Sequence, residues 1–252
     1  MYDIQLLVDG RAVTKYQHNG ETYVEGRRNS QYKLKLINNS NSRAEFVVSV
    51  DGLSIVNGEQ ASADGTGWLV NARSSIVVEG WLINTESVAA FKFSDKGKSY
   101  SAQSDQGTQN VGVIGLAVYS EKEKEYHQAY PLPYYPDSWY PGTMGPTHRL
   151  ETWCGIWEPL FGSSASDVQL SSQAFNSSIG TEFGQEIKQA TQQVNFNRSH
   201  KAPVIKTIYY GDARDLNKLG IVLDWQKPKT STKPNPFPAD FCKPPKNWKP
   251  NE

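Results

Sequence analysis

Short runs of alternating polar and apolar residues, separated by turn signals, recur about every eight to twelve residues through the first 120 positions. The clearest run is QYKLKLI at 31–37, whose strict alternation predicts a strand with one buried face. Asn19-Gly20 has the composition of a two-residue hairpin turn. This pattern predicts a mainly β fold, an antiparallel β-sandwich or jelly-roll-like domain. The expected strands are 2–8, 16–18, 22–25, 31–37, 44–50, 75–82, 88–93 and 111–119.

The regular pattern divides the chain into four expected parts. Residues 1–120 form the β-sandwich domain, and the charged run EKEKE opens a Pro/Tyr/Trp-rich extension at 121–178. The prolines of this extension fix φ and remove backbone donors, so a regular ladder is not expected there. Residues 179–225 form a small strand-helix portion that completes the sandwich or packs on it. Residues 226–252 form a Pro/Lys-rich C-terminal arm.

The strand-helix portion contains one strong strand signal and one strong helix signal. Val204 to Tyr210 reads VIKTIYY and predicts a strand. Asp212 to Gly220 predicts a short helix, with Asp212 as N-cap and Gly220 as the stop. The segment 185–197 fits either a long strand or a short helix, and 221–225 is expected as a last strand.

The charge and hydropathy of the chain narrow the classes of partner. Among its 252 residues the chain has 26 basic and 26 acidic side chains, so no overall field favours nucleic acid or an anionic membrane. No apolar run is long enough to cross a bilayer, and no signal peptide is visible. Cys154 and Cys242 could form one disulfide, although two unpaired thiols in a reducing compartment is the commoner pattern. A soluble protein made in the cytoplasm is expected.

No motif in the chain identifies a reaction or a metal site. None of the four histidines is spaced for metal binding, and GxSxG and CxxC are absent. Cys154 lies between Trp153 and Trp157, which indicates a buried thiol and not a nucleophile. Asp212 and Asp215 fit the cap and first turn of a helix better than a catalytic pair. We therefore expect no catalytic residue, no cofactor and no enzymatic activity.

Aromatic side chains are concentrated in the extension and in the C-terminal arm. Tyr and Trp bury large areas at low entropic cost and are frequent at the centres of protein interfaces. They also stack on sugar rings, and they can simply fold back over their own domain. We favour the interface interpretation. The expected interface residues are Tyr130, Tyr134, Tyr135, Trp139, Tyr140, Trp153, Trp157, Phe237, Phe241 and Trp248.

Nine segments of the chain form a recognisable set: LLVDGR, YVEGRR, VVSVDGL, NGEQASADGTGWLV, SIVVEGWL, VAAFKFSDKGKSYSAQ, GTQNVGVIGLAVYSE, GTEFGQE and PVIKTIYYGDARDLNKLGI. Together they resemble an uncharacterised family of β-rich proteins found in bacterial genomes and among phage virion proteins. The resemblance covers most of the chain except residues 126–178 and the final tail. It implies a β-sandwich scaffold and a place in a virus particle, but no known chemistry.

These observations predict a non-enzymatic structural protein of a bacteriophage particle, as a capsid decoration or accessory protein or as a tail or neck component, which binds neighbouring subunits through its extended arms. It would be made in the host cytoplasm and reside in the virion. Its partners would be copies of itself and other virion proteins, with no direct nucleic acid contact and no membrane. The alternative is a carbohydrate-binding β-sandwich module for surface glycans. A hydrolase of surface polymers is a third hypothesis, and it would need convergent acids in a cleft.

Overall fold

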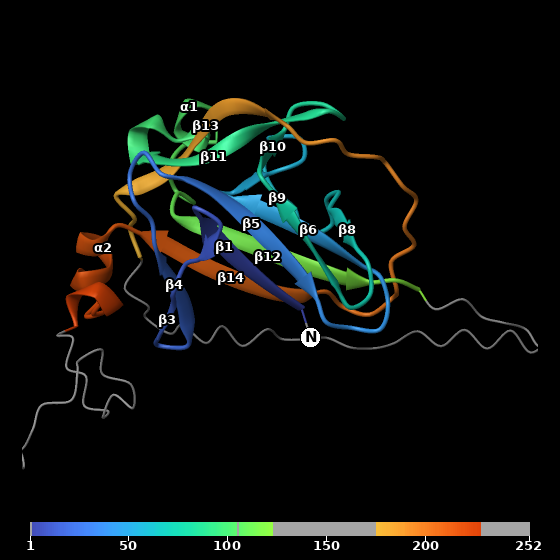
Figure 1. Ribbon diagram of the computed structural model, residues 1–252, viewed down its shortest axis with the longest axis horizontal. Coiled ribbons are helices and arrows are strands. Elements are labelled where there is room, and N and C mark those ends of the chain that lie inside the picture. Colours follow the sequence, from blue (N-terminus) through green and yellow to red (C-terminus); the bar gives the residue numbers. More distant parts are fainter. Residues whose placement is uncertain (1, 105, 123–174, 228–252) are drawn as a thin grey trace, which may run out of the picture. The chain divides into compact units, whose positions relative to one another are not determined.

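The computed structural model describes residues 2–104, 106–122 and 175–227, which form two β-sheets packed face to face (Figure 1). The mainly β, sandwich-like fold expected from the sequence is confirmed. One sheet contains β1 (Tyr2–Val8), β2 (Arg11–Ala12), β5 (Gln31–Asn38), β9 (Ser74–Val78), β10 (Gly80–Leu82), β11 (Ser87–Asp95) and β13 (Ile179–Lys188). The other contains β3 (Lys15–His18), β4 (Glu21–Glu25), β6 (Ala44–Val50), β7 (Leu53–Ser54), β8 (Trp68–Val70), β12 (Val113–Ser120) and β14 (Val204–Gly211). The helical elements are η1 (Lys96–Lys98), α1 (Tyr100–Gln103), α2 (Ala213–Lys218) and η2 (Asp224–Gln226).

Strands from both ends of the described chain meet in each sheet. The first sheet has the order β10-β11-β5-β1-β2, with β13 paired to β11 and β9 paired to β5. The second has the order β3-β4-β14-β12-β6-β7, with β8 paired to β6. Every ladder is antiparallel except that between β4 and β14, which is parallel and short. The two late strands β13 and β14 therefore belong to the sheets that the first 120 residues build.

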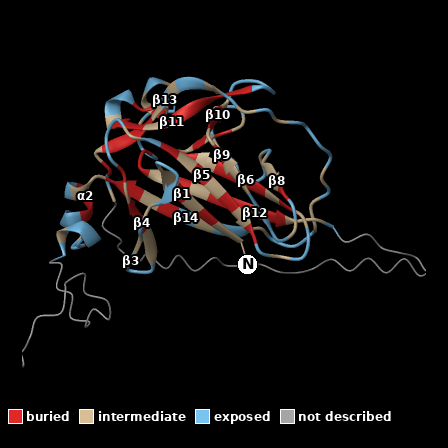
Figure 2. Cartoon of the chain, viewed as in Figure 1, coloured by how far each residue is buried: buried red, intermediate tan, exposed pale blue. Residues whose placement is uncertain are grey.

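The hydrophobic core lies between the sheets and follows the alternation seen in the sequence. In β5 the side chains of Tyr32, Leu34 and Leu36 are buried, while their neighbours are half-exposed (Figure 2). Tyr32 stacks on Phe91 and Phe93, with ring centroids 5.2 Å and 4.3 Å away. Burial of each large apolar side chain contributes about 1.5–3 kcal/mol, so this continuous core holds the two layers together.

A buried polar network crosses the core at one end. Asp51 is 1% exposed and takes a left-handed backbone with φ of 52° at the β6–β7 turn. Its Oδ1 accepts hydrogen bonds from the Tyr210 hydroxyl at 2.5 Å and the Gly112 N–H at 2.9 Å. Its Oδ2 accepts one from the Thr181 N–H at 2.7 Å. The Thr181 hydroxyl lies 2.8 Å from the Tyr210 hydroxyl and 2.7 Å from that of Tyr32. Because Tyr32 and Thr181 belong to the first sheet, the network links both layers.

Burial controls the ionisation of this network. It raises the pKa of Asp51 from 3.8 to about 6, although the hydrogen bonds from Tyr210, Thr181 and Gly112 act in the opposite direction. Burial also raises the pKa of Tyr32 and Tyr210 well above the ordinary value. The tyrosine hydroxyls therefore stay protonated and available as donors to the carboxylate.

The chain crosses from β13 to β14 through 189–203, and Arg198 fastens this crossover to the second sheet. Its Nε donates to Glu45 Oε2 at 2.8 Å, and its Nη1 donates to the backbone oxygen of Asp64 at 2.9 Å. The guanidinium carbon also lies 4.1 Å from the centroid of the Tyr119 ring. These contacts position the start of β14.

Three details of the expected secondary structure are corrected. The expected strand 75–82 is two strands, β9 and β10, because the ladder is interrupted at Glu79. At the start of β10 the backbones approach closely, since a Cβ on Gly80 would lie only 1.8 Å from the Ala89 oxygen. The ambiguous segment 185–197 is a strand only up to Lys188. The expected last strand 221–225 is wrong, because these residues lead into the 3-10 helix η2 instead of a ladder.

The expected helix after β14 is confirmed as α2. The Asp212 carboxylate accepts from the N–H groups of Arg214 and Asp215, as an N-cap does. Gly220 follows the last turn with φ of 81°, a conformation that glycine adopts without strain.

Candidate functional site

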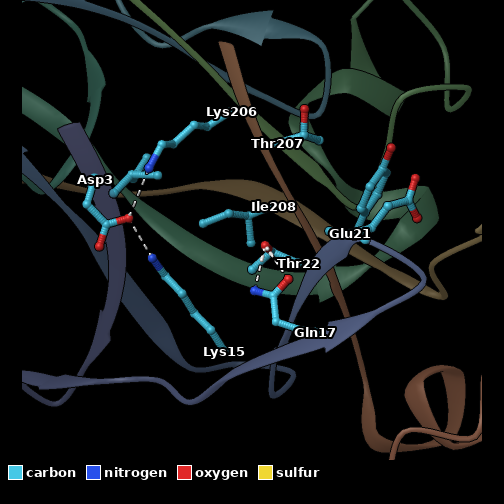
Figure 3. Close-up of a pocket in the computed structure, with 11 residues that line it drawn as sticks. Asp3, Lys15, Gln17, Glu21, Thr22, Lys206, Thr207 and Ile208 are labelled. Atoms are coloured by element: carbon cyan, nitrogen blue, oxygen red, sulfur yellow. Dashed lines mark hydrogen bonds and ion pairs between the residues drawn. The ribbon is translucent and has the colours of Figure 1, made fainter. Parts of the chain in front are cut away.

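A groove runs along one side of β14, where this strand passes β1 and the β3–β4 hairpin (Figure 3). We call it the β14 groove. Its volume is about 480 Å³, within the range of about 300–1,000 Å³ typical of ligand clefts. The lining residues are Asp3, Ile4, Lys15, Gln17, Gly20, Glu21, Thr22, Lys206, Thr207, Ile208 and Tyr209.

The wall of the groove formed by β14 is a strand edge with no strand beside it. β12 pairs with β14 along Val204–Tyr209, whereas β4 pairs with it only along Tyr209–Gly211. Within the described residues, the five positions 204–208 therefore have a strand partner on one side alone.

The backbone groups that face the groove follow from the two-residue period of a strand. The Tyr210 N–H donates to the Gly112 oxygen on the β12 side at 2.8 Å. The Gly211 oxygen accepts from the Gly26 N–H on the β4 side at 2.9 Å. Even-numbered residues of β14 thus point their backbone groups at β12. The N–H and C=O of Ile205 and Thr207 point the other way, toward the open edge.

An ion cluster forms one end of the groove. The Asp3 carboxylate lies 2.8 Å from the Lys15 ammonium and 3.9 Å from that of Lys206, and Figure 3 shows all three side chains converging. These side chains are about one-third exposed. Such an arrangement presents both signs of charge to an incoming chain.

Polar and aromatic groups form the other end. The Gln17 amide donates to the Thr22 hydroxyl at 3.0 Å, and the Tyr23 hydroxyl donates to Glu21 Oε2 at 2.6 Å. Tyr23 stacks on Tyr209 with ring centroids 5.4 Å apart. Burial raises the pKa of both tyrosines, and the Glu21 carboxylate adds to this effect. Both carboxylates of the groove, Asp3 and Glu21, thus already have donors within the protein.

The ten expected interface aromatics, Tyr130 to Trp157 and Phe237 to Trp248, all lie outside the described residues, as do Cys154 and Cys242. The expected interface therefore stays a prediction. The β14 groove was not anticipated. Its only signal in the sequence is the alternation of VIKTIYY, which identifies a strand but not which of its edges lacks a partner.

The described residues contain neither a metal-binding cluster nor a membrane-spanning helix. No group of three or more His, Cys, Asp or Glu side chains is placed to hold a metal ion in this part of the chain. Among the same residues, no helix has the length and apolar character needed to span a bilayer.

Comparisons of the chain with protein-family models, with curated proteins and with solved structures found no match.

Proposed function

We propose that this chain is a non-enzymatic structural protein of a bacteriophage particle, a capsid decoration or a tail component, which binds neighbouring copies of itself. The β-sandwich is a scaffold that suits such a role, and the resemblance of the segments quoted above supports the viral setting. The observation that carries the proposal is the open edge of β14 in the β14 groove.

An unpaired edge is a template for an added strand. Backbone N–H and C=O groups on such an edge form ladder hydrogen bonds with an extended segment of another chain, and side-chain pockets then give specificity. Exposed apolar side chains accompany this edge, since Val204 is 44% and Ile205 59% exposed. An added strand would cover part of this apolar surface.

The charges of the groove are compatible with a second copy as the occupant. Asp3 and Glu21 are balanced by Lys15 and Lys206, so the groove carries no formal net charge. The chain itself is likewise neutral, with 26 acidic and 26 basic residues. Association of a neutral groove with a neutral chain meets no long-range repulsion.

Thr207→Pro tests the proposal directly. Proline removes the N–H that faces the groove, while the β12 ladder does not use the N–H of residue 207. Thr207→Val is the matched control, since it keeps the N–H and favours a strand. We expect the wild type to self-associate with rising concentration in light scattering. Thr207→Pro should weaken that association about tenfold, the loss of roughly one interfacial hydrogen bond, and Thr207→Val should not.

Circular dichroism checks that both variants keep the sandwich. A wild type that stays monomeric at every concentration would count against self-assembly. Equal association of the proline and valine variants would show that the β14 edge is not the contact.

A further inference from the structure

Trp225 is an exposed aromatic residue on a fixed turn. It lies in η2 and its side chain is 58% exposed. The indole Nε1 donates to Glu25 Oε2 at 3.1 Å, and the Asp224 N–H donates to the Tyr16 hydroxyl at 3.1 Å. These bonds tie the turn to β3 and β4. The ring is therefore preorganised, and a ligand would not have to immobilise it.

Two hollows flank this ring. One, of about 300 Å³, extends toward β1 and β2 and includes Tyr16 and Ser30. The other, of about 420 Å³, extends toward α2 and includes Arg214. Trp225, Arg27 and Glu25 line both hollows and so lie between them. A ligand with several linked units could occupy both hollows.

The acidic groups near Trp225 are engaged within the protein. Glu25 accepts from the indole and from Arg27, and its side chain is only 13% exposed. Asp212 caps α2 and accepts from Arg28. Burial alone would raise the pKa of Asp212, but the hydrogen bonds from Arg28 and from the backbone outweigh it and lower the pKa. Asp224 pairs with Lys227 at 2.8 Å.

The basic groups are more available. The Arg27 side chain is 67% exposed and reaches Glu25 only at 3.4 Å. Arg11 and Arg214 are exposed, and among the described residues no carboxylate lies within ion-pairing distance of either. Around Trp225 a ligand therefore meets the accessible guanidinium groups of Arg11, Arg27 and Arg214 beside the Asp224 carboxylate, which is 55% exposed and paired with Lys227. Guanidinium binds carboxylates through paired hydrogen bonds.

We propose that the Trp225 site binds an acidic glycan, with one sugar ring stacked on the indole and the carboxylates of its neighbours held by Arg27 and Arg214. A uronic-acid polymer has both chemical features that the site addresses. Its C–H faces are apolar and pack on an aromatic ring, and its carboxylates recur from one sugar to the next.

Single-stranded nucleic acid, the other ligand that stacks on Trp beside Arg, fits less well. Such sites use several rings along a continuous basic groove. Among the residues that line these hollows, Trp225 is the one aromatic side chain that both share, so the site offers a single stacking ring where such nucleic-acid sites use several.

Isothermal titration of the full chain with oligogalacturonate tests the proposal, with neutral maltooligosaccharide and a single-stranded oligonucleotide as the other probes. We expect oligogalacturonate to bind most tightly, and added salt to weaken it. Trp225→Ala should lower the affinity about tenfold, and Trp225→Tyr should retain most of it. Arg27→Gln should reduce the preference for the acidic over the neutral sugar. Val222→Ala, a change at an exposed apolar residue on the same segment, should leave binding unchanged.

Three results would overturn the proposal: no binding of oligogalacturonate, equal binding by wild type and Trp225→Ala, or tighter binding of the oligonucleotide. Because Trp225 and Arg27 lie on the surface, we expect their variants to keep the fold, and circular dichroism checks that they do. The outcome is also independent of self-association through β14, which Thr207→Pro measures.

Discussion

Replacing Asp51 by Asn tests whether burial or hydrogen bonding controls the carboxylate in the core. The folded protein holds the pKa of Asp51 at about 6, against 3.8 for the ordinary carboxyl. A folded-state pKa that is raised means that the stability contributed by this group is fully present below about pH 4. It is then lost as the pH rises through about 6.

The magnitude follows from the size of the shift. A difference of about two pKa units corresponds to about 3 kcal/mol between the two protonation states. At acid pH the protonated Asp51 can donate to the Tyr210 hydroxyl, and the chain of hydroxyls through Thr181 to Tyr32 reverses direction. Asn has no proton to lose, so this pH dependence should vanish in Asp51→Asn.

Urea unfolding of both proteins between pH 7.5 and pH 4 measures the effect. We expect the wild type to gain about 3 kcal/mol of unfolding free energy relative to Asp51→Asn on acidification. The change with pH carries the prediction, because the amide NH2 also replaces one of the two oxygens that accept from Tyr210, Gly112 and Thr181, a cost of about 1–3 kcal/mol at every pH.

Asp9→Asn is the matched control. Asp9 has φ of 50° and precedes a glycine with positive φ, as Asp51 does, but it is exposed. It controls for the exchange of a carboxylate for an amide at a turn of the same backbone geometry. A difference for Asp51→Asn that stays constant, or that grows toward neutral pH, would refute the argument that burial outweighs the three hydrogen bonds.

Two further changes test the packing of the sandwich. Gly80→Ala should lower the unfolding free energy by about 3 kcal/mol, since its Cβ would collide with the backbone of Ala89. Gly97→Ala, at a position with nothing within 4 Å, should be tolerated in the same thermal unfolding experiment, and equal effects would contradict the clash. Arg198→Ala should cost about 2 kcal/mol, because it leaves the half-buried Glu45 carboxylate without its guanidinium. Hydrogen exchange should then speed up first in the crossover, and uniform acceleration would argue against a local role.

The sequence predicted the local elements well where one signal dominated. Alternation identified β1 and β5 almost to the residue, because one face of each lies in the core. β-Branched and aromatic residues identified β6. Asp212 and Gly220 identified the ends of α2 for an equally local reason, since capping uses the residue itself and its immediate neighbours.

Strands of two or three residues escaped prediction. β2, β7 and β8 are too short to show a period, and they exist because a longer neighbour pairs with them. β10 was included in the expected strand 75–82, but not as a separate strand. The segment 221–225 shows the opposite error. Its apolar residues predicted a strand, yet within the described residues no strand pairs with it, and Trp225 remains at the surface.

The sequence by itself determined that the chain alternates, turns often and forms sheets, since these properties depend on residues a few positions apart. Only the tertiary structure decided which residues meet. Asp51, Thr181 and Tyr210 are separated by 130 and 29 positions, and they converge because β6, β13 and β14 come together across the two sheets. The β14 groove and the Trp225 site arise in the same way. Each depends on which strand edge is left without a partner and which side chains surround it, and neither is encoded in any short stretch of sequence.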